Sequence, residues 1–157
     1  MIDHIYTYFT IEMIFLWLNL GVLPFWMILI IFPQSQICRV FITSIFPIFI
    51  LSLTYSYLLY LFYNEGYDFL RNFELYMGLD AISNLFTNKA FIIIFWTHFL
   101  AMNLFCGGWI VKDSQKFGIN KTLISIPLLT TYFIGPIGLT LYWIIRIFYT
   151  KRINLYD

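Results

Sequence analysis

The amino-acid sequence predicts an all-α fold, an integral membrane four-helix bundle with an amphipathic helix at the membrane surface between its second and third spans. Of its 157 residues, 61% are hydrophobic and only 11% are charged. A soluble domain of this length could not bury that much apolar surface, whereas a bilayer accepts it directly. The five Trp and twelve Tyr residues are typical of membrane interfaces, where an apolar ring carries a polar group.

Four apolar segments reach the roughly 20 residues that a helix needs to cross a hydrocarbon core of ~30 Å. They cover residues of about 10–32, 40–63, 90–111 and 122–149. No internal repeat and no low-complexity linker separates them, so we expect residues 1–157 to form one membrane domain. No basic stretch precedes the first span, which predicts an uncleaved anchor. A bacterial inner membrane, or a plastid-type membrane with an organelle-encoded product, is the expected location.

The residues between the second and third predicted spans have an apolar and a polar face at helical spacing. The apolar face has Leu75, Leu79, Ile82 and Phe86, and the polar face has Asp80, Asn84 and Asn88. This pattern predicts an amphipathic helix that lies on the membrane surface. An ordinary capping loop stays open as the alternative.

Pro136 lies near the middle of the fourth predicted span, within Gly135-Pro136-Ile137-Gly138. A proline inside a helix has no backbone N–H and leaves the carbonyl four residues earlier without its usual donor. That carbonyl belongs to Tyr132, so we expect a bent helix and a polar acceptor at membrane depth.

The charge balance and the cysteines exclude several classes of partner. The formal net charge is +1 and the Lys and Arg residues do not cluster, which argues against nucleic acid. Cys38 and Cys106 have neither a metal-ligand spacing nor the number expected of a disulfide framework, so we interpret both as packing residues. No metal site and no cofactor is predicted.

Polar residues on the first span are candidate functional residues, because polar groups at that depth cost free energy unless they are paired or used. Glu12, Asn19 and Trp26 recur every seven residues and therefore share one face, with a drift of only ~20° per heptad. The stripe lines a site, or Glu12 lies among headgroups while Asn19 bonds a neighbouring helix. Both interpretations stay open.

The third span carries His98 and Asn103 near its centre, about 140° apart around an ideal helix. They line one interior cavity from two sides, or each of them meets a different helix. A neutral imidazole both donates and accepts, so His98 can relay a proton or bind a ligand hydroxyl. A structural hydrogen bond to another helix is the alternative.

Two charged residues near span ends are interpreted as anchors. Arg146 is within snorkelling reach of the interface. Asp113 is expected to pair with Lys112 or Lys116.

A larger set of residues recurs in a known order and spacing: Asn19, Leu23-Pro24-x-Trp26, Leu85-Phe86-Thr87, Trp96-x-His98-x-Leu100-Ala101, Leu104-Phe105-x-Gly107-x-Trp109, Asp113, Gly118-Ile119, Pro127-x-Leu129-Thr130, Gly135-Pro136-x-Gly138, Tyr142 and Arg146. With this set the chain resembles the abscisic-acid-deficient-four-like family over most of its length. The resemblance is strongest from Phe86 to Arg146.

The resemblance implies a small four-span membrane protein. Plant and algal members are plastid proteins required to convert violaxanthin into neoxanthin, an isomerisation of an epoxy-carotenoid to an allene, and bacterial relatives exist. This chain departs from the family pattern at two places. Asn103 stands where the family commonly has the acid of Ala-Phe-Asp-Leu-Phe, and Asn120-Lys121 replaces the Pro-His that often follows Gly-Ile.

Two functions remain open. An enzyme of carotenoid or related isoprenoid metabolism would open an epoxide with a proton donor at oxygen and a base at carbon, without a redox cofactor. Its catalytic candidates are His98 and Glu12, and its substrate-binding candidates are Asn103, Asn19, Trp26 and Tyr132.

The alternative is a non-catalytic membrane protein that binds a pigment or helps to assemble a membrane complex. A small-solute or proton carrier is the weaker third function, because four spans without an inverted repeat provide little machinery for transport unless a homo-oligomer forms. The expected partners are membrane lipid, a carotenoid or other isoprenoid ligand, and a second copy of the chain.

Overall fold

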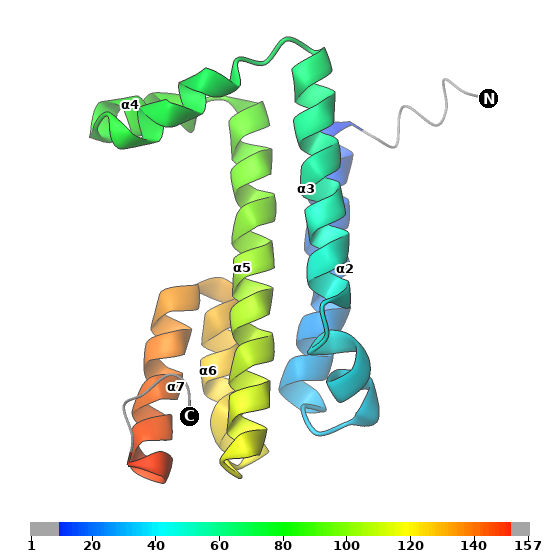
Figure 1. The fold of residues 1–157 in the computed structure, drawn as a ribbon, viewed down its shortest axis with the longest axis vertical. Helices are drawn as coiled ribbons and strands as arrows, with labels where there is room; N and C mark the ends of the chain where they lie inside the picture. Colours follow the sequence, from blue (N-terminus) through cyan, green and yellow to red (C-terminus); the bar gives the residue numbers. More distant parts are fainter. Residues whose placement is uncertain (1–9, 152–157) are drawn as a thin grey trace, which may run out of the picture. The chain divides into compact units, whose positions relative to one another are not determined.

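The computed structural model describes residues 10–151, which form helices joined by short turns and contain no strand. Within these residues, three helices are long and apolar enough to cross a membrane. They are α2 (Ile11–Ile31), α3 (Phe46–Asn64) and α5 (Lys89–Lys116) (Figure 1). The all-α class is confirmed, and these helices match the first three predicted spans.

The fourth predicted span, residues 122–149, is wrong as a single helix. The segment forms α6 (Lys121–Phe133) and α7 (Gly135–Thr150), which run back along each other as a hairpin (Figure 1). At 1.5 Å per residue these helices are about 20 and 24 Å long, shorter than a hydrocarbon core of ~30 Å. A four-helix bundle is therefore not confirmed.

The physical reason lies in the residues around the break. Ile134 has φ −140° and ψ 81°, which ends α6, and Pro136 occupies the first turn of α7. Proline suits that position because its fixed φ is helical and its missing N–H would have no partner there. The proline therefore starts a new helix where the sequence predicted a bend in one helix.

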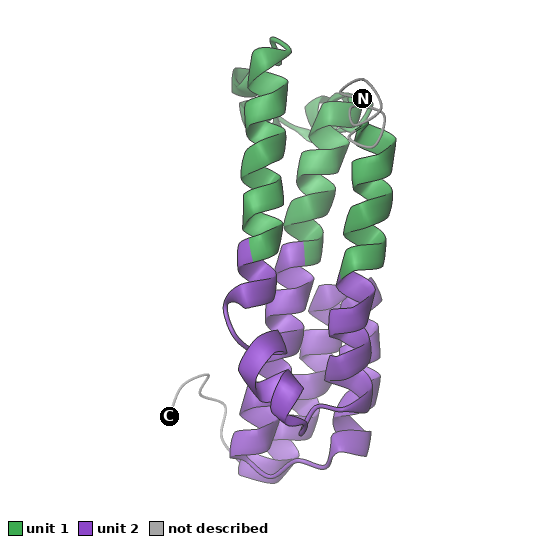
Figure 2. Cartoon of the chain, turned by 90° about the vertical axis from the view of Figure 1, so that its right-hand side faces the viewer, with its two compact units in different colours: residues 1–21, 50–100 green, residues 22–49, 101–157 purple. Residues whose placement is uncertain are grey.

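The chain forms two compact units (Figure 2). Unit 1 combines Met1–Gly21 with Ile50–Leu100, and unit 2 combines Val22–Phe49 with Ala101–Asp157. Each unit is described separately below. The single domain over residues 1–157 stays a prediction.

In unit 1, a 3-10 helix η3 (Phe69–Tyr76) and helix α4 (Leu79–Leu85) connect α3 to α5 and project sideways from the start of α5 (Figure 1). They occupy the place of the predicted amphipathic helix. Gly78, with φ 131°, separates them, which is why the pattern is divided between two short helices. Asp80 is exposed, as the pattern predicts, but Leu79 and Phe86 of the predicted apolar face are 81% and 39% exposed, and the buried residue of α4 is Leu85.

In unit 2, α6 and α7 approach closely because of Gly138. A Cβ atom at Gly138 would lie 2.6 Å from Thr131 Cα and would also collide with the Thr131 hydroxyl. No larger residue fits this contact, so glycine sets the distance between the two helices. The Thr131 hydroxyl donates to the Pro127 carbonyl at 2.7 Å, which satisfies it inside the hairpin.

One turn of π-helix, η2 (Cys38–Ile42), precedes α3 in unit 2. Cys38 is fully buried there. Burial raises the pKa of its thiol to about 11, so the thiol stays neutral and unreactive at physiological pH. This agrees with the interpretation of Cys38 as a packing residue.

We expect Gly138→Ala to lower the free energy of unfolding by about 2 kcal/mol, because the added methyl group overpacks the contact with Thr131. Gly21→Ala is the matched control, since its Cβ would meet nothing within 4 Å inside α2. That control should raise stability by up to ~1 kcal/mol, the usual gain of alanine over glycine in a helix. Denaturant unfolding in mixed micelles measures both variants, and equal effects would contradict the close packing of the hairpin.

Candidate functional site

The first two residues of the polar stripe on α2 bond α5 within unit 1. Lys89 Nζ donates to Glu12 Oε1 at 2.9 Å, and Trp96 Nε1 donates to Asn19 Oδ1 at 3.2 Å. Both pairs are separated by 77 residues, so α2 and α5 run parallel in register here. Asn19 Nδ2 also donates to the Phe15 carbonyl at 2.7 Å. Asn19 therefore bonds a neighbouring helix, as the second interpretation above expects, while Glu12 pairs with Lys89.

Trp26, the third member of the stripe, is buried in unit 2 with 3% of its surface exposed. Its ring meets the Tyr132 ring edge-on, with 5.4 Å between the centroids. A Cβ atom at Gly107 would lie 2.7 Å from the Trp26 ring, so glycine is what admits the indole. Trp26 packs α2 against α5 and α6 in this unit.

The side chain of Asn103, a residue of α5, reaches the break between α6 and α7 and is 6% exposed. Its Nδ2 donates to the Tyr132 carbonyl across a long 3.5 Å contact. Its Oδ1 lies directly against Gly135, where a Cβ atom would collide with it. The Tyr132 carbonyl, which the sequence predicted to be free at membrane depth, thus accepts from the Asn103 carboxamide. Two of the substrate-binding candidates, Asn103 and Tyr132, therefore bind each other.

His98 is exposed on α5, whereas Asn103 is buried. The expectation that both side chains line one interior cavity is therefore wrong. The reason is the 140° between them on the helix, which turns the imidazole outward when the amide turns inward. The exposed face of α5 continues with Met102 and Phe105, and no hydrogen bond among the described residues involves His98.

Glu12 and His98, the two catalytic candidates, are also far apart within unit 1. Glu12 is paired with Lys89, nine residues before His98 on the same helix. Nine residues correspond to about 14 Å along a helix axis. The two groups thus lie at different levels of unit 1, and their role as an acid and a base on one substrate stays a prediction.

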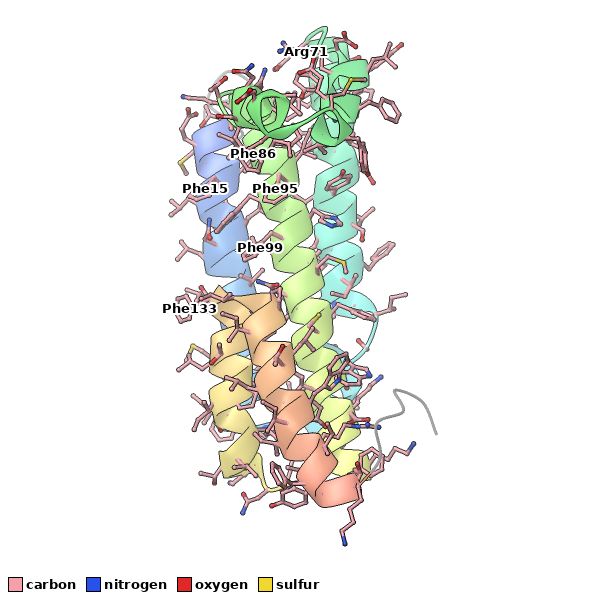
Figure 3. The ribbon with its side chains drawn as sticks, turned by 90° about the vertical axis from the view of Figure 1, so that its left-hand side faces the viewer. Phe15, Arg71, Phe86, Phe95, Phe99 and Phe133 are labelled. Atoms are coloured by element: carbon pink, nitrogen blue, oxygen red, sulfur yellow. The ribbon has the colours of Figure 1, made fainter. Side chains whose placement is uncertain are left out.

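Unit 1 also has two groups of contacting aromatic rings, which together we call the aromatic face: Phe15, Phe86, Phe95, Trp96 and Phe99. Phe95 is 40% exposed, with its ring 5.0 Å from that of Phe86. The Trp96 ring stacks on Phe99 at 5.2 Å and contacts Phe15 at 5.8 Å. Figure 3 shows the four phenylalanines on one side of the unit. The hydrogen bond from Trp96 to Asn19 holds the indole in place.

The second polar cluster was missed by the sequence interpretation. In unit 2, Asp113 Oδ2 accepts from Tyr142 Oη at 2.6 Å and from Arg146 Nε at 2.7 Å. Arg146 and Asp113 side chains are 3% and 8% exposed. The guanidinium also covers the Phe117 ring, and the Trp109 ring packs edge-on against Tyr142. Acid, phenol and guanidinium are thus buried together between α5 and α7.

The interpretation of Asp113 and Arg146 as separate anchors is therefore wrong. Asp113 pairs with Arg146 and not with a neighbouring lysine, and Arg146 does not snorkel. A hairpin between α6 and α7 is needed to bring these residues together, and one straight span would have kept them apart. One signal was available: Tyr142 and Arg146 are four residues apart, hence on one face of a helix.

These observations define a helical protein with three candidate membrane spans and a buried acidic-basic cluster at its final hairpin. A family model described as ABA DEFICIENT 4-like matches residues 13–142, and the chain belongs to this family. It is 26% identical over 129 residues to the protein ABA DEFICIENT 4, chloroplastic, of Arabidopsis thaliana. That alignment covers 80% of this chain and 57% of the relative, so the chain spans little more than half of the relative's length. No solved structure matches the chain.

We expect Asp113→Ala to lower the free energy of unfolding by about 3–5 kcal/mol, because it leaves the Arg146 charge buried without its carboxylate. The double variant Asp113→Leu with Arg146→Met should be less destabilised than this single variant, since it leaves neither charge behind. Glu12→Gln is the control, because the Glu12–Lys89 pair is exposed and should contribute little. If the loss of stability in the double variant equals the sum of the losses caused by its two substitutions made singly, the buried pair is not coupled.

Proposed function

We propose that this chain is a multi-pass membrane protein that binds a carotenoid or related isoprenoid lipid. Three helices with the length and composition of membrane spans support the first part. Helices α6 and α7 are too short to cross, so the hairpin enters and leaves on one side. The Arabidopsis relative is a chloroplastic protein, which supports a plastid-type or related bacterial membrane for this chain.

The aromatic face is the observation that carries the binding proposal. Phe95 is in ring contact with Phe86, and Trp96 with Phe15 and Phe99. These rings stay partly uncovered, with Phe15 44% and Phe95 40% exposed. Conjugated chains pack well against such rings, because aromatic contacts add to the free energy of area burial. A long apolar ligand reaches this surface laterally from the bilayer and needs no channel. Family membership directs the proposal toward the carotenoid class.

We expect the double substitution Phe95→Ala and Phe99→Ala to weaken carotenoid binding about tenfold, since each lost ring contact is worth roughly 0.5–1.5 kcal/mol. Protein in lipid nanodiscs is titrated with the pigment, and the shift of its visible absorption band gives the affinity. Tyr60→Ala is the matched control, because Tyr60 is a 66% exposed aromatic residue on α3 of the same unit. Wild-type protein that produces no shift would remove the binding proposal.

Epoxide-opening isomerisation is the second candidate function, and the free imidazole of His98 favours it. Neutral imidazole has one N–H donor and one nitrogen acceptor. In the balanced reaction the N–H protonates the epoxide oxygen as its C–O bond breaks, and the second nitrogen takes the proton from carbon as the allene forms. The imidazole is left as its other tautomer, and no electrons are gained or lost.

We expect His98→Ala to lower the conversion of an epoxy-carotenoid to its allenic isomer at least ~100-fold, the usual effect of removing a general acid–base group. Membrane insertion and pigment binding should stay unchanged. Met102→Ala, an exposed substitution one turn further along α5, is the control. Chromatography of the pigments from proteoliposomes measures the conversion, and full activity in His98→Ala would exclude the imidazole as the catalytic group.

A further inference from the structure

A cavity of about 390 Å³ opens in unit 1 where α3 ends and α5 begins. The turn after α3 and the first residues of η3 complete its wall, so it lies at the ends of two candidate membrane spans. Its volume falls within the range of roughly 300–1,000 Å³ that is usual for small-molecule sites. We call it the end cavity.

The floor of the end cavity is apolar. Phe62 is 1% exposed, and Ala90 forms part of the wall from α5. The Tyr67 ring lies 6.2 Å from that of Phe62 and 5.0 Å from that of Phe69, so aromatic packing fixes its position. The positive φ of 78° at Gly66 turns the chain from α3 toward this ring.

The rim of the end cavity has hydrogen-bonding groups of both kinds. Asn88 Oδ1 accepts from the backbone amide of Ala90 at 2.8 Å, which caps α5 and leaves the Asn88 amide N–H groups without a partner among the described residues. The Glu65 carboxylate is exposed and accepts no hydrogen bond within residues 10–151. Arg71 is held loosely by Glu74 at 3.6 Å. A donor and an acceptor are thus available at one rim.

The phenol of Tyr67 also lines the end cavity and donates to Asn72 Oδ1 at 2.8 Å. Burial raises the pKa of Tyr67, with smaller effects from the nearby charges. The phenol therefore stays neutral at physiological pH. The apolar floor together with neutral and charged groups on the rim suits a ring that is hydrocarbon on one side and carries oxygen on the other.

We propose that the end cavity binds the oxygen-bearing end ring of the isoprenoid ligand, with its hydrocarbon chain continuing along α5 onto the aromatic face. This inference rests on the binding function proposed above. Oxygen atoms of a membrane amphiphile stay near the interface, because burying an unpaired hydroxyl in hydrocarbon costs free energy. Asn88 on the rim and Phe95 on the aromatic face are seven residues apart, hence on one face of the helix and about 10 Å apart along its axis, which a conjugated chain easily spans. Glu65 would accept from a ring hydroxyl and Asn88 would donate to it.

The test compares zeaxanthin with β-carotene, which share one conjugated chain and differ only in two ring hydroxyls. Full-length protein in nanodiscs should bind zeaxanthin about tenfold more tightly, the value of one or two satisfied hydrogen bonds. Glu65→Ala combined with Asn88→Asp should abolish this preference and leave β-carotene affinity unchanged. Asn88→Asp is chosen because its carboxylate still caps α5 while its amide donor is lost. Asp80→Ala, an exposed acid on α4 away from the end cavity, is the matched control.

The outcomes separate the two proposals. Equal affinities for both pigments in wild-type protein, or a preference that survives the double substitution, would overturn the end-ring site while the binding function stands. Failure to bind either pigment would overturn both. Circular dichroism and elution volume confirm that each variant is folded before its affinity is compared.

Discussion

The carboxylate of Asp113 is the constraint on which unit 2 depends. It accepts from Tyr142 and Arg146, and it thereby holds α7 against α5. In a membrane, a hairpin of two short helices would leave helix ends at a depth where water is absent, and such backbone is stable only inside protein. A charge buried there without a partner costs several kcal/mol. Asp113, Tyr142 and Arg146 therefore depend on one another for their hydrogen bonds. Their mutual contacts favour the hairpin over a single crossing helix.

Once α7 is fixed, the Tyr132 carbonyl at the break before Ile134 needs a hydrogen-bond donor. Asn103 Nδ2 donates to the Tyr132 carbonyl, and its Oδ1 packs against Gly135 where no Cβ atom would fit. An ionised carboxylate has no donor and could not make the first contact. The position where the family commonly has an acid is thus occupied here by a residue that suits the capping contact. The same contact uses the amide, so Asn103 is a packing residue of the hairpin in this chain.

The sequence predicted the three long helices well, because length and uniform apolarity are sufficient to indicate a crossing helix. The seven-residue spacing of Glu12 and Asn19 also correctly placed them on one face. The break at Ile134 was missed, since Pro136 suits a bent helix and a first turn equally, and only packing against Thr131 and Asn103 decides between them. The pairing of Asp113 with Arg146 depends on that break and could not be predicted before it. The outward direction of His98 was missed because helical spacing gives angles between residues, not which face meets a neighbour.

The polar groups between the helices already have hydrogen-bond partners within the protein. Asn19 bonds Trp96, Asn103 bonds the Tyr132 carbonyl, and Asp113 bonds Arg146. Chemistry on a ligand needs groups that are not already used. Those groups lie on the outside of unit 1, at the imidazole of His98 and at the rim of the end cavity. A lipid-soluble ligand arrives from the bilayer itself, so a site that faces outward has direct access to it. Interior polar residues thus stabilise the helices, while in the proposed function the exposed aromatic face and the end cavity recognise the ligand.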